Sequence, residues 1–176
     1  MALVIVAVIA ALAITSSPTT SCVWSPDGNT LAVGTAVGRV YLVDAQTGNS
    51  RRTLEGYAAP AGFLAFSHDG RKFAVAGGDL NVLVFDLQDD GPPIVCRGHS
   101  SYVTSAAFSM DDNRLGTTSG DGTARLWDPR TGKQMLQINV AKVNTAGLAF
   151  HPDGQRFFVA DNAGNIHVYR APRILP

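Results

Sequence analysis

The sequence predicts an all-β repeat protein built from four copies of one 42-residue unit. An aromatic residue opens a tight turn in every copy, at Trp24, Phe66, Phe108 and Phe150, always 42 residues apart. A second marker keeps the same step and falls at Val43-Asp44, Phe85-Asp86, Trp127-Asp128 and Tyr169-Arg170. A fixed repeat of this length is typical of propellers and solenoids, in which each unit is one supersecondary element that presents a surface.

The third copy shows the plan of the unit most clearly. Its short runs are separated by turns rich in Gly, Pro and Asp, and they cover Val103–Phe108, Arg114–Ser119, Thr123–Trp127 and Lys133–Asn139. Such runs and turns predict β-strands. Four strands in series predict an antiparallel meander, which is one propeller blade.

Side-chain size predicts where the strands of a blade lie. The first run of each copy carries mostly small residues, which suits an innermost strand where the blades converge. The third runs carry larger apolar residues, which we expect to fill the space between neighbouring blades. These residues are Val40, Leu42, Val82, Val84, Leu126, Ile166 and Val168.

Several motifs of the third copy resemble the WD-repeat family of β-propellers. They are Gly98-His99, Ser119-Gly120-Asp121-Gly122 and Trp127-Asp128, and the resemblance extends over about residues 15–170. It implies a WD-repeat propeller or partial propeller with four-stranded antiparallel blades. It also implies a buried, stabilising hydrogen-bonded chain formed by His99, Thr117, Asp121 and Trp127. The other copies lack parts of this set, so we expect them to rely on apolar packing.

The repeat register divides the chain into blades. We predict blade 1 at 15–56, blade 2 at 57–98, blade 3 at 99–140 and blade 4 at 141–176, the last without an outer strand of its own. The apolar segment 1–14 has the phase of an outer strand and is predicted to close the last blade; the alternative is a signal segment. Three arrangements stay open: a fragment of a longer propeller, two chains in one ring, or a closed ring of four blades.

Charge and cysteine content exclude several classes of protein. The chain has 14 basic and 14 acidic residues, so it lacks the positive footprint of a nucleic-acid binder. The pairs Arg51-Arg52 and Arg71-Lys72 are expected to be solvated at strand ends or on outer strands. Cys22 and Cys96 are expected to be buried thiols, because two cysteines build no disulfide framework or zinc site.

Motifs for chemistry are absent from the sequence. It contains no phosphate-binding loop, nucleophile elbow or zinc-binding helix motif, and its four His residues share no ligand spacing. We therefore predict no catalytic residue, no cofactor and no metal site. The apolar segment 1–14 is also too short to span a bilayer as a helix, so no membrane span is predicted.

Loops at one end of the blades form the candidate interaction face. Its predicted members are Tyr57, Pro60, Tyr102, Lys142 and Asn144. Tyrosine is a frequent interface anchor because it combines apolar area with a polar tip.

We interpret the chain as a non-catalytic scaffold that binds other proteins, with self-association through open blades as an added expectation. The expected location is cytoplasmic, or exported if residues 1–14 are a signal segment. One alternative is a propeller enzyme of the hydrolase type with a site in its central channel. Another is a fragment of a larger multi-repeat signalling or regulatory protein.

Overall fold

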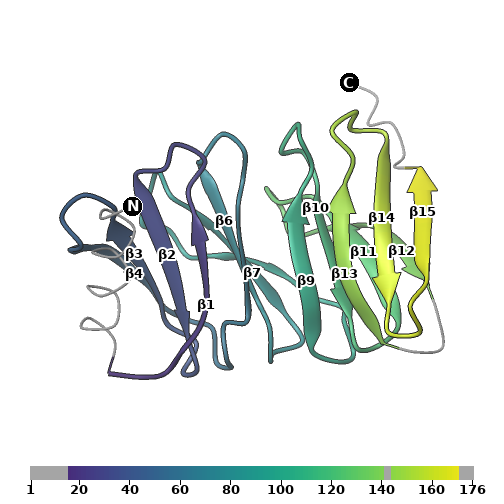
Figure 1. Cartoon of the computed structure of the whole chain (residues 1–176), viewed down its shortest axis with the longest axis horizontal. Helices are drawn as coiled ribbons and strands as arrows, with labels where there is room; N and C mark the ends of the chain where they lie inside the picture. The colour runs from purple at the N-terminus through teal and green to yellow at the C-terminus, as the bar shows by residue number, and fades with distance from the viewer. Residues whose placement is uncertain (1–15, 141–143, 171–176) are drawn as a thin grey trace.

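The computed structural model describes residues 16–140 and 144–170, and the regular structure within these ranges is all β-strand (Figure 1). Blade 1 contains β1 (Thr19–Trp24), β2 (Thr30–Thr35), β3 (Val40–Asp44) and β4 (Ser50–Leu54). Blade 2 contains β5 (Phe63–Phe66), β6 (Lys72–Ala76), β7 (Val82–Asp86) and β8 (Ile94–Cys96). Blade 3 contains β9 (Val103–Phe108), β10 (Leu115–Ser119), β11 (Thr123–Trp127) and β12 (Gln134–Asn139). Blade 4 contains β13 (Thr145–Phe150), β14 (Arg156–Asp161) and β15 (Ile166–Arg170).

Each blade is one antiparallel meander whose strands pair in chain order. Three sheets have four strands, and the fourth has three among the residues described. The predicted all-β fold of four antiparallel repeats is therefore confirmed. The strands of blade 3 begin and end within one residue of the predicted bounds, because the Gly, Pro and Asp turns fix where each strand stops. The predicted closing strand in segment 1–14 lies outside the described residues.

The hydrophobic core lies between the sheets. Consecutive first strands β1, β5, β9 and β13 are neighbours, and the blades stand in a row with blades 1 and 4 at its ends (Figure 1). At each junction, the third strand of one blade packs against the first three strands of the next. Val40 and Leu42 thus meet Phe73 and Val75 of blade 2. The described blades form an open row and no closed ring of four.

The repeat makes the other two junctions in the same way. Val82 and Val84 of blade 2 pack against Leu115 and Trp127 of blade 3. Ala124 and Leu126 of blade 3 pack against Phe157 and Val159 of blade 4, and all of these side chains are buried. The prediction that large third-strand residues fill the space between blades is right for blades 1 to 3.

The same prediction is wrong for blade 4. Ile166 and Val168 are 72% and 58% exposed, because no described blade follows blade 4. The expectation for Cys22 is also wrong: this thiol is exposed, while Cys96 is buried. Cys22 occupies the place in the repeat that Leu148 holds in blade 4. Leu148 packs on the preceding blade, and no described blade precedes blade 1.

A hydrogen bond to a backbone carbonyl links consecutive blades at the same place in each repeat. The N–H of Ala61 donates to the carbonyl of Thr35 at 3.1 Å, and the N–H of Val103 donates to the carbonyl of Gly77 at 2.9 Å. At the third junction the hydroxyl of Thr145 donates to the carbonyl of Ser119 at 2.7 Å. Gly77 has a φ of +149°, and a Cβ there would collide with the carbonyl oxygen of Pro60 in the same blade. The backbone of this loop therefore requires glycine at position 77.

A carboxylate at the opposite end of the blades ties blade 3 to blade 2. Asp112 Oδ1 accepts from the His68 N–H at 2.8 Å and lies 3.0 Å from His68 Nδ1, while Oδ2 accepts from the Asp69 N–H at 2.9 Å. Asp112 has a φ of +53°, where the other three repeats have glycine. These hydrogen bonds offset the cost of the left-handed backbone, which is about 1–2 kcal/mol for a residue with a Cβ.

We predict that Asp112→Ala lowers the free energy of unfolding by about 2 kcal/mol, because it removes these hydrogen bonds and keeps a Cβ at positive φ. Asp112→Gly loses the same bonds but relieves the backbone, so its loss is smaller by about 1 kcal/mol. Urea denaturation measures both values. The control is Asp90→Ala, whose parent carboxylate is 94% exposed. An Asp112→Ala protein as stable as the control would contradict the role assigned to this carboxylate.

Candidate functional site

The structure brings His99, Thr117, Asp121 and Trp127 into one hydrogen-bonded chain inside blade 3. His99 Nδ1 lies 3.0 Å from Asp121 Oδ2, and His99 Nε2 lies 2.8 Å from Thr117 Oγ1. Trp127 Nε1–H donates to the same hydroxyl oxygen at 2.8 Å. An ionised carboxylate only accepts, so the proton of the imidazole sits on Nδ1 and the Thr117 hydroxyl donates to Nε2.

Burial and hydrogen bonding set the charge states in this chain. Burial lowers the pKa of His99 and outweighs the opposing pull of Asp121. Burial alone would raise the pKa of Asp121, but hydrogen bonds from Thr123, Ser100 and His99 lower it to about 2. The site therefore holds a neutral imidazole against a charged carboxylate, and Arg125 Nη2 lies 3.8 Å from that carboxylate.

The order hydroxyl, imidazole, carboxylate is also that of a nucleophilic triad. Two observations favour a structural role here. The Thr117 hydroxyl accepts the indole N–H, and both Thr117 and Trp127 are 0% exposed, so a substrate has no path to the oxygen. Within the described ranges, no buried side-chain nitrogen or oxygen lacks a hydrogen-bond partner.

Tyr57 does not belong to the interaction face, and its assignment there was wrong. It is 4% exposed and packs in the core between blades 1 and 2. Tyr57 occupies the place in the repeat that His99 holds in blade 3, and its hydroxyl accepts the N–H of Asp79 at 3.1 Å. Burial raises its pKa to about 12. Its bulk and hydroxyl thus replace the imidazole in blade 2.

The remaining members of the predicted face are Pro60, Tyr102, Lys142 and Asn144. Tyr102 is 46% exposed, and its hydroxyl accepts from Asn144 Nδ2 at 2.8 Å, so the structure brings these two together. Pro60 is exposed. Lys142 lies outside the described residues. Tyr102 sits over Gly120, where a Cβ would come within 2.9 Å of its ring.

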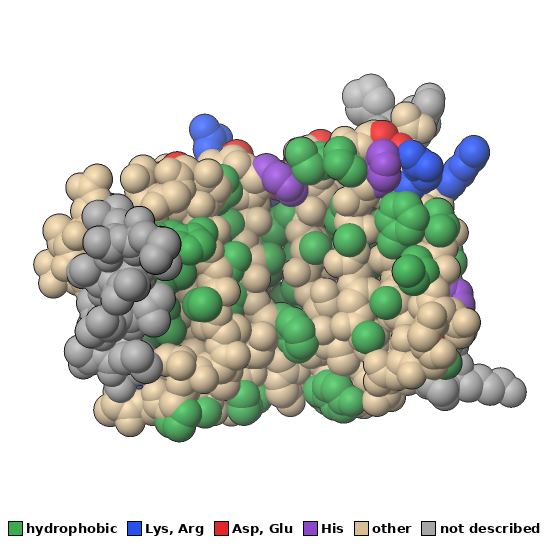
Figure 2. Space-filling model, viewed as in Figure 1, with side chains coloured by type: hydrophobic (Ala, Val, Ile, Leu, Met, Phe, Trp, Pro, Cys, Tyr) green, Lys and Arg blue, Asp and Glu red, His purple; other side chains and the backbone are tan. Residues whose placement is uncertain are grey.

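Two apolar residues of this face escaped the sequence analysis. Val37 and Leu80 are 55% and 46% exposed, and they lie in the β2–β3 and β6–β7 turns. Figure 2 shows hydrophobic side chains along the lower edge of the molecule, where these turns and the start of β9 lie in Figure 1. A signal was present, since Val37 and Leu80 stand where the third repeat has Asp121 and Gly122.

Contacts between loops make this end of the molecule one surface. A Cβ at Gly38 would collide with the backbone of Tyr57 and Ala59, and one at Gly78 would lie 3.1 Å from Pro60 Cδ. The turns of blades 1 and 2 are therefore packed together through glycine. We call the set Val37, Pro60, Leu80, Tyr102 and Asn144 the loop face, in which Asn144 is half-buried and the other four are exposed.

The described residues contain no group of three or more His, Cys, Asp or Glu side chains arranged to hold a metal ion. They also contain no helix with the length and apolar character needed to cross a membrane.

Comparison with known proteins finds family-model matches in two parts of the chain and one similar solved structure. Residues 91–128 match the family model of the WD domain, G-beta repeat, and residues 13–60 match that of the anaphase-promoting complex subunit 4 WD40 domain. A chain in the crystal structure of the mitotic checkpoint complex superposes with a TM-score of 0.80 at 23% identity. The match covers 88% of this chain and 50% of that chain, so this chain spans about half the length of its structural relative. No curated protein matches in sequence.

We predict that Trp127→Ala destabilises the protein by about 3–5 kcal/mol, because it opens a cavity and removes the indole N–H from Thr117. Tyr102→Ala should change stability by about 0.5 kcal/mol or less, since its ring is exposed. Thermal and urea denaturation compare the two variants. Unfolding of Tyr102→Ala would contradict the placement of Tyr102 on an exposed surface. A Trp127→Ala protein as stable as the wild type would contradict the stabilising role of Trp127 in blade 3.

Proposed function

We propose that this chain, whose residues 13–60 and 91–128 match WD-repeat family models and whose fold matches a solved propeller structure, is a non-catalytic WD-repeat scaffold that binds other proteins. The observation that carries the proposal is the loop face. Val37, Leu80 and Tyr102 are each about half exposed and lie at the same end of successive blades. Apolar side chains in turns contribute little to folding, and exposed patches of this kind mark interaction sites.

The chemistry of the loop face fits a protein surface. Tyr102 offers ring area and a hydroxyl already oriented by Asn144, and an anchor held in place loses little entropy on binding. Leu80 and Val37 supply aliphatic area beside it. The expected partner surface is apolar with a polar rim, as is usual in protein–protein contacts.

The first strands favour a scaffold over the alternative of a propeller enzyme. These strands would line a central channel, and in β1, β5, β9 and β13 the only ionisable side chain is Cys22. Hydrolytic chemistry needs acids, bases or metal ligands that converge on the substrate. Turnover in a hydrolase panel, or stoichiometric bound metal, would favour the enzyme.

A pull-down tests the scaffold proposal. We predict that proteins captured by the wild-type chain are lost with Leu80→Ser/Tyr102→Ala, because truncating apolar anchors costs about 2 kcal/mol or more each in affinity. The matched control is Met135→Ser, since Met135 is 45% exposed on β12. Quantitative mass spectrometry compares the captured sets. If the double variant and the control retain the same proteins, the loop face is not the binding surface.

We further propose that copies of the chain associate through the open face of blade 4. Pairing places Ile166 beside Ala160 and Val168 beside Phe158 on one face of the sheet. At the same places in blade 3, Ala124 and Leu126 are 1% and 2% exposed because blade 4 covers them. The open face thus repeats a surface that is covered at every other junction, and a second copy of the chain can cover it.

Sedimentation equilibrium tests the association. We predict that the wild-type mass rises with concentration and that Ile166→Lys/Val168→Lys stays monomeric, because burying an unpaired ammonium in an apolar contact is costly. Met135→Lys, an exposed change on the outer strand of blade 3, should associate like the wild type. A wild-type chain that remains monomeric at all concentrations would refute this contact.

A further inference from the structure

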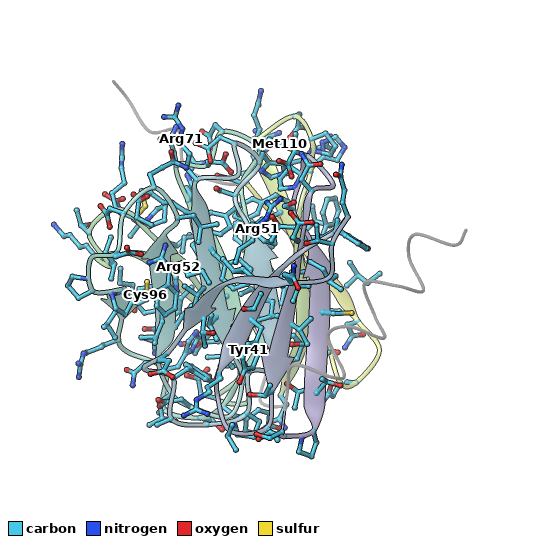
Figure 3. All side chains as sticks on the ribbon, turned by 90° about the vertical axis from the view of Figure 1, so that its left-hand side faces the viewer. Tyr41, Arg51, Arg52, Arg71, Cys96 and Met110 are labelled. Carbon is cyan, nitrogen blue, oxygen red and sulfur yellow. The ribbon has the colours of Figure 1, made fainter. Side chains whose placement is uncertain are left out.

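A cavity of about 670 Å³ lies between blades 1 and 2, at the end of the blades away from the loop face. Its walls include the β1–β2 turn of blade 1, the β5–β6 turn of blade 2 and strand β4. Leu42, Phe66 and Leu87 supply an apolar lining, and Arg51 and Arg52 stand beside it. Figure 3 labels both arginines, which come from consecutive positions of β4.

The repeat explains why a carboxylate bridges the next junction and none bridges this one. Between blades 2 and 3, Asp112 binds the backbone N–H groups of His68 and Asp69. Between blades 1 and 2, Gly70 stands in the place of Asp112, and Pro26 stands in the place of His68. Glycine has no side chain to reach across, and proline has no N–H to donate.

Arg52 places a charge where blades 2 and 3 have an aliphatic side chain. Ile94 and Leu136 hold the same place in blades 2 and 3 and pack into their hydrophobic junctions. Arg52 lies on the outer strand β4, and its side chain is only partly solvated at 24% exposed. Its guanidinium donates to the carbonyl of Asp86 at 3.2 Å.

The carboxylate partner of Arg52 is easily exchanged. Arg52 Nη2 lies 3.2 Å from Asp90 Oδ1, and the Asp90 side chain is 94% exposed. A pair with one fully solvated member contributes little to stability. A planar guanidinium with free N–H groups can therefore exchange Asp90 for another carboxylate.

The other charged side chains around the cavity are held by hydrogen bonds or ion pairs to residues near them. Arg51 donates to Asp44 and to the hydroxyl of Thr30. Asp27 accepts from Ser25 and Asn29. Asp69 accepts from Ser67 and from the Arg71 N–H, and Asp86 pairs with Lys72. Arg52 is thus the charge on the lining whose partner is most exposed.

We propose that this cavity binds a short segment of a partner protein in which an acidic residue stands next to an aromatic or aliphatic one. The carboxylate replaces Asp90 on Arg52, and the apolar side chain packs on Phe66, Leu42 and Leu87. The inference rests on the proposed function as a protein-binding scaffold and adds a second, chemically distinct site to it.

Fluorescence anisotropy with defined probes tests the proposal. The probe is a fluorescein-labelled hexapeptide with the core Phe-Asp-Leu-Asp, and its matched control carries Asn for both Asp residues. We expect the acidic probe to bind the full chain at least about tenfold more tightly than the Asn probe, because a charge-assisted hydrogen bond is lost. Arg52→Gln should weaken the acidic probe by about the same factor. The control Arg130→Gln, at a surface pair with Asp128 in blade 3, should have no effect.

Asp90→Asn is expected to strengthen binding of the acidic probe, and a misfolded protein would not bind the probe more tightly. Removing the internal competitor should tighten the acidic probe by about twofold to threefold. Equal binding of both probes, or acidic binding unchanged by Arg52→Gln and by Asp90→Asn, would overturn the proposal. The proposed scaffold function is tested separately, by the pull-down with Leu80→Ser/Tyr102→Ala, so failure of one proposal can be told from failure of the other.

Discussion

Face-to-face stacking of the blades is the constraint on which the rest of this structure depends. A single four-stranded sheet cannot bury either of its faces, so each blade is stable only with a neighbour. The third strand of one blade supplies Val and Leu, and the next blade supplies an aromatic residue such as Phe73, Trp127 or Phe157. Because this contact repeats every 42 residues, it also fixes which loops share an end. The loop face, the cavity and the open face of blade 4 are all consequences of that stacking.

The junctions differ in chemistry although their geometry repeats. Blade 3 holds a complete hydrogen-bonded chain from Asp121 to Trp127, and blade 2 keeps one hydroxyl contact through Tyr57. The carboxylate of Asp112 bridges one junction, and Gly70 at the preceding one has no side chain to do so. A repeat whose fold is secured by apolar packing can vary its polar residues, and such variation creates distinct surfaces on similar blades.

Much of the fold could be predicted from the sequence because turn residues and spacing are local signals. The strands of blade 3 and the residues of its polar chain follow from Gly, Asp and Trp at fixed positions. The failures concern burial, which depends on neighbours. Tyr57 lies in a loop, which predicts exposure, but its phase is that of His99 and its ring packs in the core between blades 1 and 2. Ile166 and Val168 have the phase of residues that are buried in the other blades, but the sequence of one repeat does not say whether a further blade covers it. Val37 and Leu80 form no motif of their own, and only comparison with Asp121 and Gly122 of the third repeat marks them as apolar residues in turns.

Hydrogen–deuterium exchange over the strands tests the stacking most directly. If covered faces stabilise each blade, the amides of β7 and β11, which have a blade on each side, should exchange slowest. Those of β15, with Ile166 and Val168 open to solvent, should exchange markedly faster in dilute protein. Exchange of β15 as slow as that of β11 under those conditions would contradict the account.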